Sequence, residues 1–315
     1  MVLGQFSMHS SRTEMMTLPL NVELEATENT FSLEQYVKAL EDGGFDITKH
    51  DDLIASAPLL ARLANNKAFL LERMFDELRD QLRFQSGNIY APEVLLLHST
   101  SEYFVRANIW KPISAAEQAI PGYQYDVCHD HNFDILTVGY LGPGYSCRSY
   151  SYESRENGGR LGEEVELIDE GVFSLTNGRT ALYRAKRDVH IQLPPDQISV
   201  SLNLIPRAPV QNEMQFQFDE GSGAICRYLN FSGVEAAIRV ADVLRAGESV
   251  DALVHIGNGH PSAKIRALAL AAQVHAEPHR ADDILAGVAA DQSDYVQYLL
   301  DLELAESGST MRVVR

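Results

Sequence analysis

The apolar positions of this chain follow three successive patterns. Between residues 32 and 84 they recur every three or four positions, which is the spacing of one face of a helix. From about residue 92 they form short continuous or alternating runs separated by Gly, Pro and Asn, which is typical of β-strands. After about residue 232, Ala- and Leu-rich stretches return to helical spacing. We therefore predict a flexible arm over residues 1–30, helices over 31–90, a β-barrel over 91–231 and a helical region over 232–315.

The first helical region contains three predicted helices. Ser32 can cap a helix that Gly43-Gly44 ends, because a hydroxyl accepts from the free amides at a helix start and Gly tolerates the backbone that ends one. A second segment covers residues 51–64, and Asn65 or Asn66 can cap a third. The third segment carries one apolar stripe, formed by Phe69, Leu70, Met74, Leu78 and Leu82. Because the stripes are one-sided, these helices should pack on another part of the protein.

The middle region contains many short strands, which favours a sandwich or barrel over alternating β and α units. Asn177-Gly178 predicts a tight hairpin between two of these strands. After them, three stretches (233–247, 263–277 and 281–306) predict a small helical bundle. The predicted strands are 94–99, 102–110, 133–141, 146–153, 163–171, 172–178, 181–188, 189–195, 197–205, 214–220 and 224–229.

Composition narrows the classes of function. The 315 residues carry a formal net charge of -18, which disfavours phosphate backbones and anionic lipid as partners. We therefore predict neither nucleic-acid nor membrane binding. Three cysteines are too few for a disulfide framework and favour a reducing compartment. The first residues lack the basic start and apolar core of a signal peptide, so we predict a cytoplasmic protein.

The sequence His129-Asp130-His131, followed 59 residues later by His190, is the main candidate for chemistry. Alternate side chains of a strand point the same way, so His129 and His131 would share one face. A third imidazole from a neighbouring strand would complete a three-nitrogen cap on a metal ion that leaves positions open for substrate. The alternative is structural: two exposed strand histidines and one histidine buried in the core.

Two acidic residues lie beside this sequence. Asp130 should point to the opposite face from its neighbours, which makes it a poor metal ligand. Asp134 reaches the site only if the strand bulges or turns, and we keep it as a fourth-ligand candidate or as a partner of a ligating histidine.

These residues resemble the cupin superfamily, and within it the thiol dioxygenases of the cysteine dioxygenase type. The resemblance rests on the run His129-Asp130-His131, on His190 ahead of the strand Val200-Ser201-Leu202, and on an arginine after an aromatic residue on an earlier strand. That arginine is Arg106, 23 residues before His129. The resemblance covers roughly residues 90–206. It implies a mostly β fold, a cupin-type barrel or jelly roll, and an arginine that holds a substrate carboxylate. The N- and C-terminal helices that flank this barrel are predicted by the apolar spacing and are not part of the resemblance.

The resemblance and the three histidines together predict a metal-dependent oxygenase. Fe(II) is the expected cofactor, with O₂ and a small polar, carboxylate-bearing molecule as substrates. Tyr125 and Tyr140 are our candidates for the pocket lining, because aromatic walls with one polar tip suit a small site. Two alternatives stay open, a zinc or nickel hydrolase or isomerase and a non-catalytic sensor. We expect the helical flanks either to cap the barrel or to form a homodimer interface.

Overall fold

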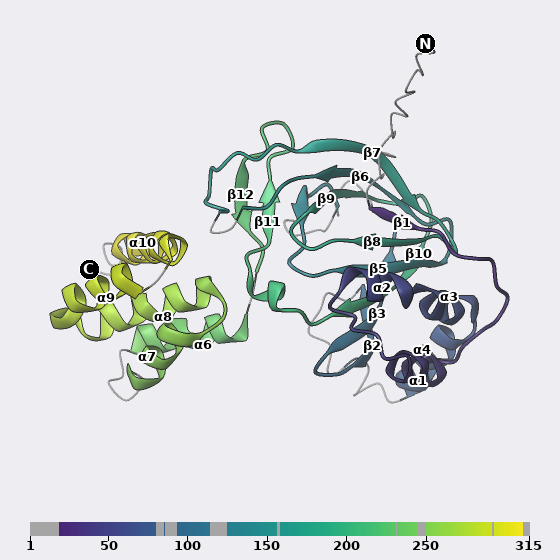
Figure 1. Ribbon diagram of the computed structural model, residues 1–315, viewed down its shortest axis with the longest axis horizontal. Helices are drawn as coiled ribbons and strands as arrows, with labels where there is room; N and C mark the ends of the chain where they lie inside the picture. Colours follow the sequence, from purple (N-terminus) through teal and green to yellow (C-terminus); the bar gives the residue numbers. More distant parts are fainter. Residues whose placement is uncertain are drawn as a thin grey trace, which may run out of the picture.

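The protein is built around two facing antiparallel β-sheets with helices at both ends (Figure 1). This computed structural model describes residues 19–79, 85, 93–113, 125–155, 158–230, 232–244, 250–291 and 293–310. The predicted β-structure flanked by N- and C-terminal helices is confirmed. Within the described part the strands form two separate six-stranded sheets rather than one closed barrel.

Sheet A has the strand order β1-β8-β5-β10-β3-β2, and sheet B has the order β12-β11-β4-β9-β6-β7. The strands of sheet A are β1 (Leu20–Val22), β8 (Thr180–Tyr183), β5 (Ile135–Leu141), β10 (Ser199–Pro206), β3 (Tyr103–Trp110) and β2 (Val94–Ser99). Those of sheet B are β12 (Ile225–Tyr228), β11 (Phe216–Phe218), β4 (His129–Asp130), β9 (Asp188–Leu193), β6 (Tyr145–Ser151) and β7 (Ile168–Leu175).

Strand β10 shows how alternation gives sheet A two different faces. Leu202 and Leu204 are fully buried in the apolar cluster that includes the N-terminal helices. Between them, Asn203 faces the other sheet and accepts a hydrogen bond from Thr137 Oγ1, with the two oxygens 2.6 Å apart. Ser201, two residues before Asn203, accepts a hydrogen bond from Trp110 Nε1 at 3.0 Å. The space between the sheets is therefore lined in part by buried polar groups that are hydrogen-bonded to one another.

The N-terminal helices cover the outer face of sheet A (Figure 1). They are α1 (Leu33–Asp42), α2 (His50–Ala55), α3 (Ala57–Asn65) and α4 (Phe69–Arg79). As predicted, Ser32 caps α1: its Oγ accepts from the Gln35 amide, and the Gln35 side chain accepts in turn from the Ser32 amide. The helix ends at Gly43. The predicted second segment is divided at Ser56 into α2 and α3. Of the predicted α4 stripe, Phe69 and Leu70 are buried, Leu78 is exposed, and Leu82 lies outside the described residues.

The predicted N-terminal arm lies outside the described residues up to position 18. The rest of it is partly ordered by pairing, because β1 forms an edge of sheet A. Its residues Leu20 and Val22 pair with Leu182 and Thr180 of β8.

The Asn177-Gly178 turn does not form the hairpin that its sequence predicts. Gly178 has the positive φ of +78° expected in a tight turn. The strands on either side, however, belong to different sheets, because β7 pairs with β6 and β8 pairs with β5 and β1. The turn therefore carries the chain from sheet B to sheet A, and the Gly178 amide donates to the Gly139 carbonyl across it at 2.8 Å.

The C-terminal region forms helices packed around one central helix. The helices are α6 (Gly233–Leu244), α7 (Val250–Gly259), α8 (Ala263–Ala276), α9 (Ala281–Asp291) and α10 (Asp294–Thr310), with a short 3₁₀ helix over Pro278–Arg280. Another 3₁₀ helix, Pro209–Asn212, lies between β10 and β11. Helix α8 is the central one, with Ala267, Ala269 and Ala272 almost fully buried. The sequence pattern missed α7 and did not separate α9 from α10. Among the described helices, none has both the length and the apolar character needed to cross a bilayer.

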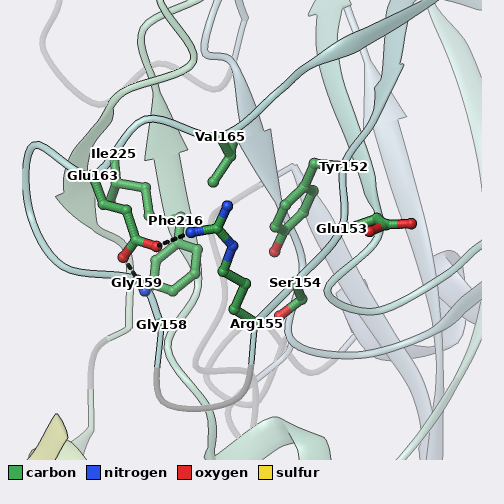
Figure 2. A pocket seen from close by; sticks show the side chains of 10 residues that line it. All are labelled: Tyr152, Glu153, Ser154, Arg155, Gly158, Gly159, Glu163, Val165, Phe216 and Ile225. Atoms are coloured by element: carbon green, nitrogen blue, oxygen red, sulfur yellow. Dashed lines mark hydrogen bonds and ion pairs between the residues drawn. The ribbon is translucent and has the colours of Figure 1, made fainter. Parts of the chain in front are cut away.

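A small pocket lies beside the outer face of sheet B, next to the C-terminal helices (Figure 2). The Glu163 carboxylate accepts from the Gly159 and Arg160 amides at 2.7 and 2.9 Å, which fixes the loop that forms one wall. The lining residues are Tyr152, Glu153, Ser154, Arg155, Gly158, Gly159, Glu163, Val165, Phe216 and Ile225.

Candidate metal centre

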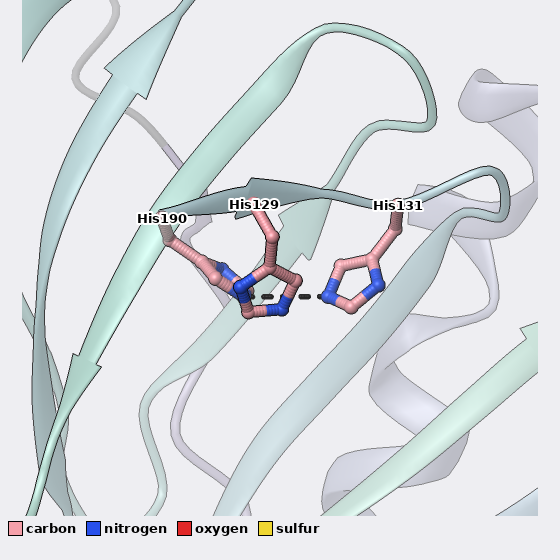
Figure 3. A group of neighbouring side chains, drawn as sticks. All are labelled: His129, His131 and His190. Atoms are coloured by element: carbon pink, nitrogen blue, oxygen red, sulfur yellow. Dashed lines mark hydrogen bonds between the residues drawn. The ribbon is translucent and has the colours of Figure 1, made fainter. Parts of the chain in front are cut away.

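The fold brings His129, His131 and His190 together on the inner face of sheet B (Figure 3). His129 on β4 and His190 on β9 are direct cross-strand partners. Strand β4 ends at Asp130, so His131 comes from the segment that follows the strand. His129 and His190 are buried and His131 is partly exposed. The three residues predicted from the two separated segments therefore form one group.

The spacing of the three rings fits a shared metal ion. Their ligand nitrogens all lie within 4.8 Å of one another, and the ring centroids are 4.7 to 5.0 Å apart. His131 Nε2 and His190 Nε2 face each other at 3.3 Å. Two nitrogens bound at about 2.1 Å to one ion would be about 3.0 Å apart at a right angle and about 3.4 Å apart at the tetrahedral angle. The observed distance lies within that range.

The outward-facing nitrogens of two rings have polar neighbours. His129 Nδ1 lies 2.9 Å from the Val127 carbonyl oxygen, which can only accept, so this nitrogen carries the proton and Nε2 keeps its lone pair. His131 Nδ1 lies 3.3 Å from the side-chain amide of Gln215. His190 Nδ1 is buried and has no hydrogen-bond partner among the described residues. The donor set is therefore three imidazoles, at least one of which has its Nε2 lone pair free for a ligand bond.

Electrostatics favours the neutral form of all three rings. Desolvation by burial lowers the pKa of His129 below its usual range. Burial, and then the neighbouring His129, lower the pKa of His190 well below that range. For His131 burial is again the largest cause of a strongly lowered pKa, followed by His129, His190 and the charge of Arg106. Neutral imidazole is the form that binds metal ions.

Arg106 lies on the side of sheet A that faces the histidines. On β3 its even-numbered neighbours Phe104 and Trp110 belong to the cluster between the sheets. Arg106 pairs in register with Asn203, which also faces inward. Its charge reaches His131, whose pKa it lowers. The guanidinium therefore places a positive charge on the side of sheet A that faces the histidine group.

The two tyrosines proposed for the pocket lining lie on different faces. Tyr125 belongs to the cluster between the sheets, and its hydroxyl bonds to the Lys111 backbone. Tyr140 does not line this space, because its ring packs on the other face of sheet A against the N-terminal helices. Its hydroxyl donates to the Asn66 carbonyl at 3.0 Å. The prediction for Tyr140 is therefore wrong: it failed because alternation along β5 turns this side chain toward the helices.

Asp134 does not join the histidine group. Its Oδ1 accepts from the Ala185 amide at 2.7 Å and lies 3.1 Å from His50 Nε2. The carboxylate thus fixes the turn before β9 to the start of α2. Asp130 faces away from the three rings, as alternation predicts.

Tyr183 is a neighbour of the site that the sequence did not single out. Its ring meets the His190 ring edge to face, with the centroids 4.7 Å apart. Its hydroxyl lies 3.4 Å from Cys147 Sγ, and both side chains are buried. The position of Tyr183 on a predicted strand of the β-rich region is the signal that could have found it. Several other tyrosines of this region also lie on predicted strands, so the signal is not specific.

Comparisons with known proteins leave the family open. No protein-family model matches the sequence, and no curated protein matches it. Solved structures with partial similarity include a hydroquinone 1,2-dioxygenase from Sphingomonas sp. TTNP3, at 12% identity and a TM-score of 0.25, covering 41% of this chain and 77% of that one. A second hydroquinone 1,2-dioxygenase, PnpCD, has 13% identity and a TM-score of 0.25, covering 39% and 69%. A cupin-2 domain from Rhodospirillum rubrum has 11% identity and a TM-score of 0.17, covering 51% and 76%. Because these identities and TM-scores are so low, the comparisons carry no argument about function. The candidate metal site rests on the sheets and histidines of this chain.

Proposed function

We propose that this protein is a metal-dependent enzyme of the cupin superfamily, a non-heme iron oxygenase that acts on a small polar substrate bearing a carboxylate. The observation that carries the proposal is the group of three imidazoles whose ligand nitrogens lie within 4.8 Å of one another inside a two-sheet fold. At 3.3 Å, His131 Nε2 and His190 Nε2 are close enough either to share one proton between two neutral rings or to bind one cation with both lone pairs, and the lowered pKa values of the two rings disfavour a second proton.

In this proposal the histidines would bind the metal and Arg106 would bind the substrate. His129, His131 and His190 would hold Fe(II), which supplies O₂ activation when it is bound. Because the three ligands are neutral, the site would keep its dipositive charge and attract an anionic donor group. Arg106 on the opposite sheet would hold the substrate carboxylate with two parallel hydrogen bonds, which fixes the substrate's orientation.

A zinc or nickel enzyme is the second candidate, because three neutral imidazoles also suit these ions and leave a position for water. A thiol dioxygenase is the most specific form of the first candidate, on the strength of the sequence resemblance. The three unpaired cysteines, two of them buried, are consistent with the cytoplasmic location that we propose.

The metal site is tested by removing one ligand at a time. The protein, purified without oxygen, should contain close to one metal ion per chain, and His129→Ala, His131→Ala and His190→Ala should each lower that content at least tenfold. The exposed His279→Ala is the matched control and should keep the wild-type content. Wild-type occupancy in all three site variants would refute the assignment.

The oxygenase step is tested by O₂ uptake with a panel of thiols, amino acids and other small carboxylates. We expect Arg106→Gln to raise KM for a carboxylate substrate about tenfold or more while the metal content stays unchanged. Bound metal without O₂ uptake on any member of the panel would favour the zinc or nickel candidate. Binding of a small carboxylate that persists after complete metal removal would favour the alternative that the protein is a non-catalytic sensor.

A further inference from the structure

A buried charged network lies directly behind the three histidines, on the outer side of sheet B. Asp130 is fully buried between two of the proposed ligands in sequence. Its carboxylate accepts three hydrogen bonds, from Tyr152 Oη at 2.7 Å, from Lys186 Nζ at 2.7 Å and from the Phe216 amide at 2.6 Å. The three donors come from the loop after β6, the turn before β9 and strand β11.

Lys186 connects the two chain segments that carry the histidines. It lies in the turn just before β9 and has a φ of +57°, which is unusual for a residue with a side chain. Its amide donates to the His131 carbonyl at 2.8 Å, and its Nζ donates to the Met214 carbonyl at 2.6 Å as well as to Asp130. Strand β4 ends at Asp130, so His131 lies outside the strand pairing. The hydrogen bond from the Lys186 amide fixes the His131 backbone there.

Burying this ion pair is costly, so its presence is weak evidence that it stabilises the fold. The side chains of Lys186 and Asp130 are 8% and 0% exposed. Removing two charges from water is expensive, and apolar side chains of similar size often give as much stability as a buried pair. A buried pair does fix geometry, because neither partner can move without leaving the other charge unpaired.

We propose that the Asp130–Lys186 pair is the positioning element of the metal site: by binding β4, the turn before β9 and β11 to one buried point, it sets the mutual arrangement of the three imidazoles. The inference rests on the proposed metal site. Asp130 and Lys186 do not touch the metal in this scheme, and they act through the backbone of His129, His131 and His190.

The test removes both charges together, so that neither is left unpaired. Asp130→Asn combined with Lys186→Met should give a folded protein, judged by far-UV circular dichroism and a cooperative thermal melt, that binds Co(II) at least tenfold more weakly than the wild type. The visible absorption of bound Co(II) should also shift, because it reports ligand geometry rather than stability. The matched control is Glu235→Gln with Lys264→Met, which removes a partly buried pair of the helical region at 2.7 Å and should leave both readouts unchanged.

The outcomes separate the positioning role from the metal site itself. A folded double variant with the wild-type Kd and spectrum overturns the positioning role and leaves the metal site intact. A wild-type protein that binds no Co(II) overturns the proposed function and the positioning role together. If the double variant does not fold, Tyr152→Phe decides, because it removes one donor and keeps both charges: we expect about threefold weaker Co(II) binding and a shifted spectrum, and wild-type values for both overturn the proposal.

Discussion

Acidification should destabilise the metal-free protein through its buried histidines. Burial holds the pKa values of His131 and His190 well below their usual range in the folded state, whereas unfolding returns each to about 6.5. Below pH 6.5 the unfolded chain therefore binds more protons than the folded one, so the free energy of unfolding falls as the pH falls. Above about pH 7.5 the two states bind the same number of protons at these groups, and the effect disappears.

The magnitude follows from the same linkage. A histidine that stays neutral when folded changes the free energy of unfolding by RT ln(1 + 10^(6.5 − pH)), which is about 1.4 kcal/mol at pH 5.5 and about 0.1 kcal/mol or less at pH 7.5. In the limit in which both rings stay neutral when folded, His131 and His190 together lower it by up to about 2.7 kcal/mol between these two pH values, and His129 adds to the loss. That is a large part of the stability of a typical folded protein, which is on the order of 5–15 kcal/mol.

Urea denaturation in the presence of a chelator, at pH 7.5 and at pH 5.5, measures the effect. His190→Gln should reduce the loss of stability between the two pH values by up to about 1.4 kcal/mol, whatever it does to stability at pH 7.5. The exposed His279→Gln should keep the wild-type difference. If His190→Gln shows the same pH difference as the wild type, the claim that this ring is held neutral in the fold is wrong.

Two further predictions concern residues of the sheets that lie away from the histidines. Gly144 has a φ of +94°, and a Cβ there would lie 2.1 Å from the Leu175 carbonyl oxygen, whereas Gly162 has a φ of +80° and open space. Gly144→Ala should therefore lower the free energy of unfolding by at least about 2 kcal/mol more than Gly162→Ala in urea denaturation, and equal losses would contradict the steric argument. Tyr140→Phe removes the hydrogen bond to Asn66 and should cost about 1 kcal/mol. Metal content should not change in that variant, and a fall would show that Tyr140 acts at the site after all.

Local patterns in the sequence predicted the elements that depend on near neighbours. The cap at Ser32, the Gly43 helix end and strand β2 followed from a few adjacent residues, because capping and alternation are local effects. The convergence of His129 and His190 also followed, since both lie on strands whose alternation could be counted.

The remaining features depend on contacts between distant parts of the chain. Asn177-Gly178 has hairpin chemistry, yet pairing with other strands placed its two flanks in different sheets. Alternation along β5 turns Tyr140 away from Tyr125, but which face of the strand the N-terminal helices cover depends on packing between distant segments. The hydrogen bonds of Asp130 were missed because its three donors lie 22, 56 and 86 positions away along the chain.

The apolar cluster behind sheet B joins the strands of that sheet and the C-terminal helices into one cooperative unit. It contains Phe216 and Ile225 from the strands together with Leu270 and Leu299 from the C-terminal helices. Hydrogen bonds also connect the strand region to the C-terminal helices. In one of them, the Leu161 amide donates to Tyr298 Oη at 2.9 Å. Separating the helices from the strands would expose apolar surface on both, so the two parts should melt in a single transition rather than one after the other.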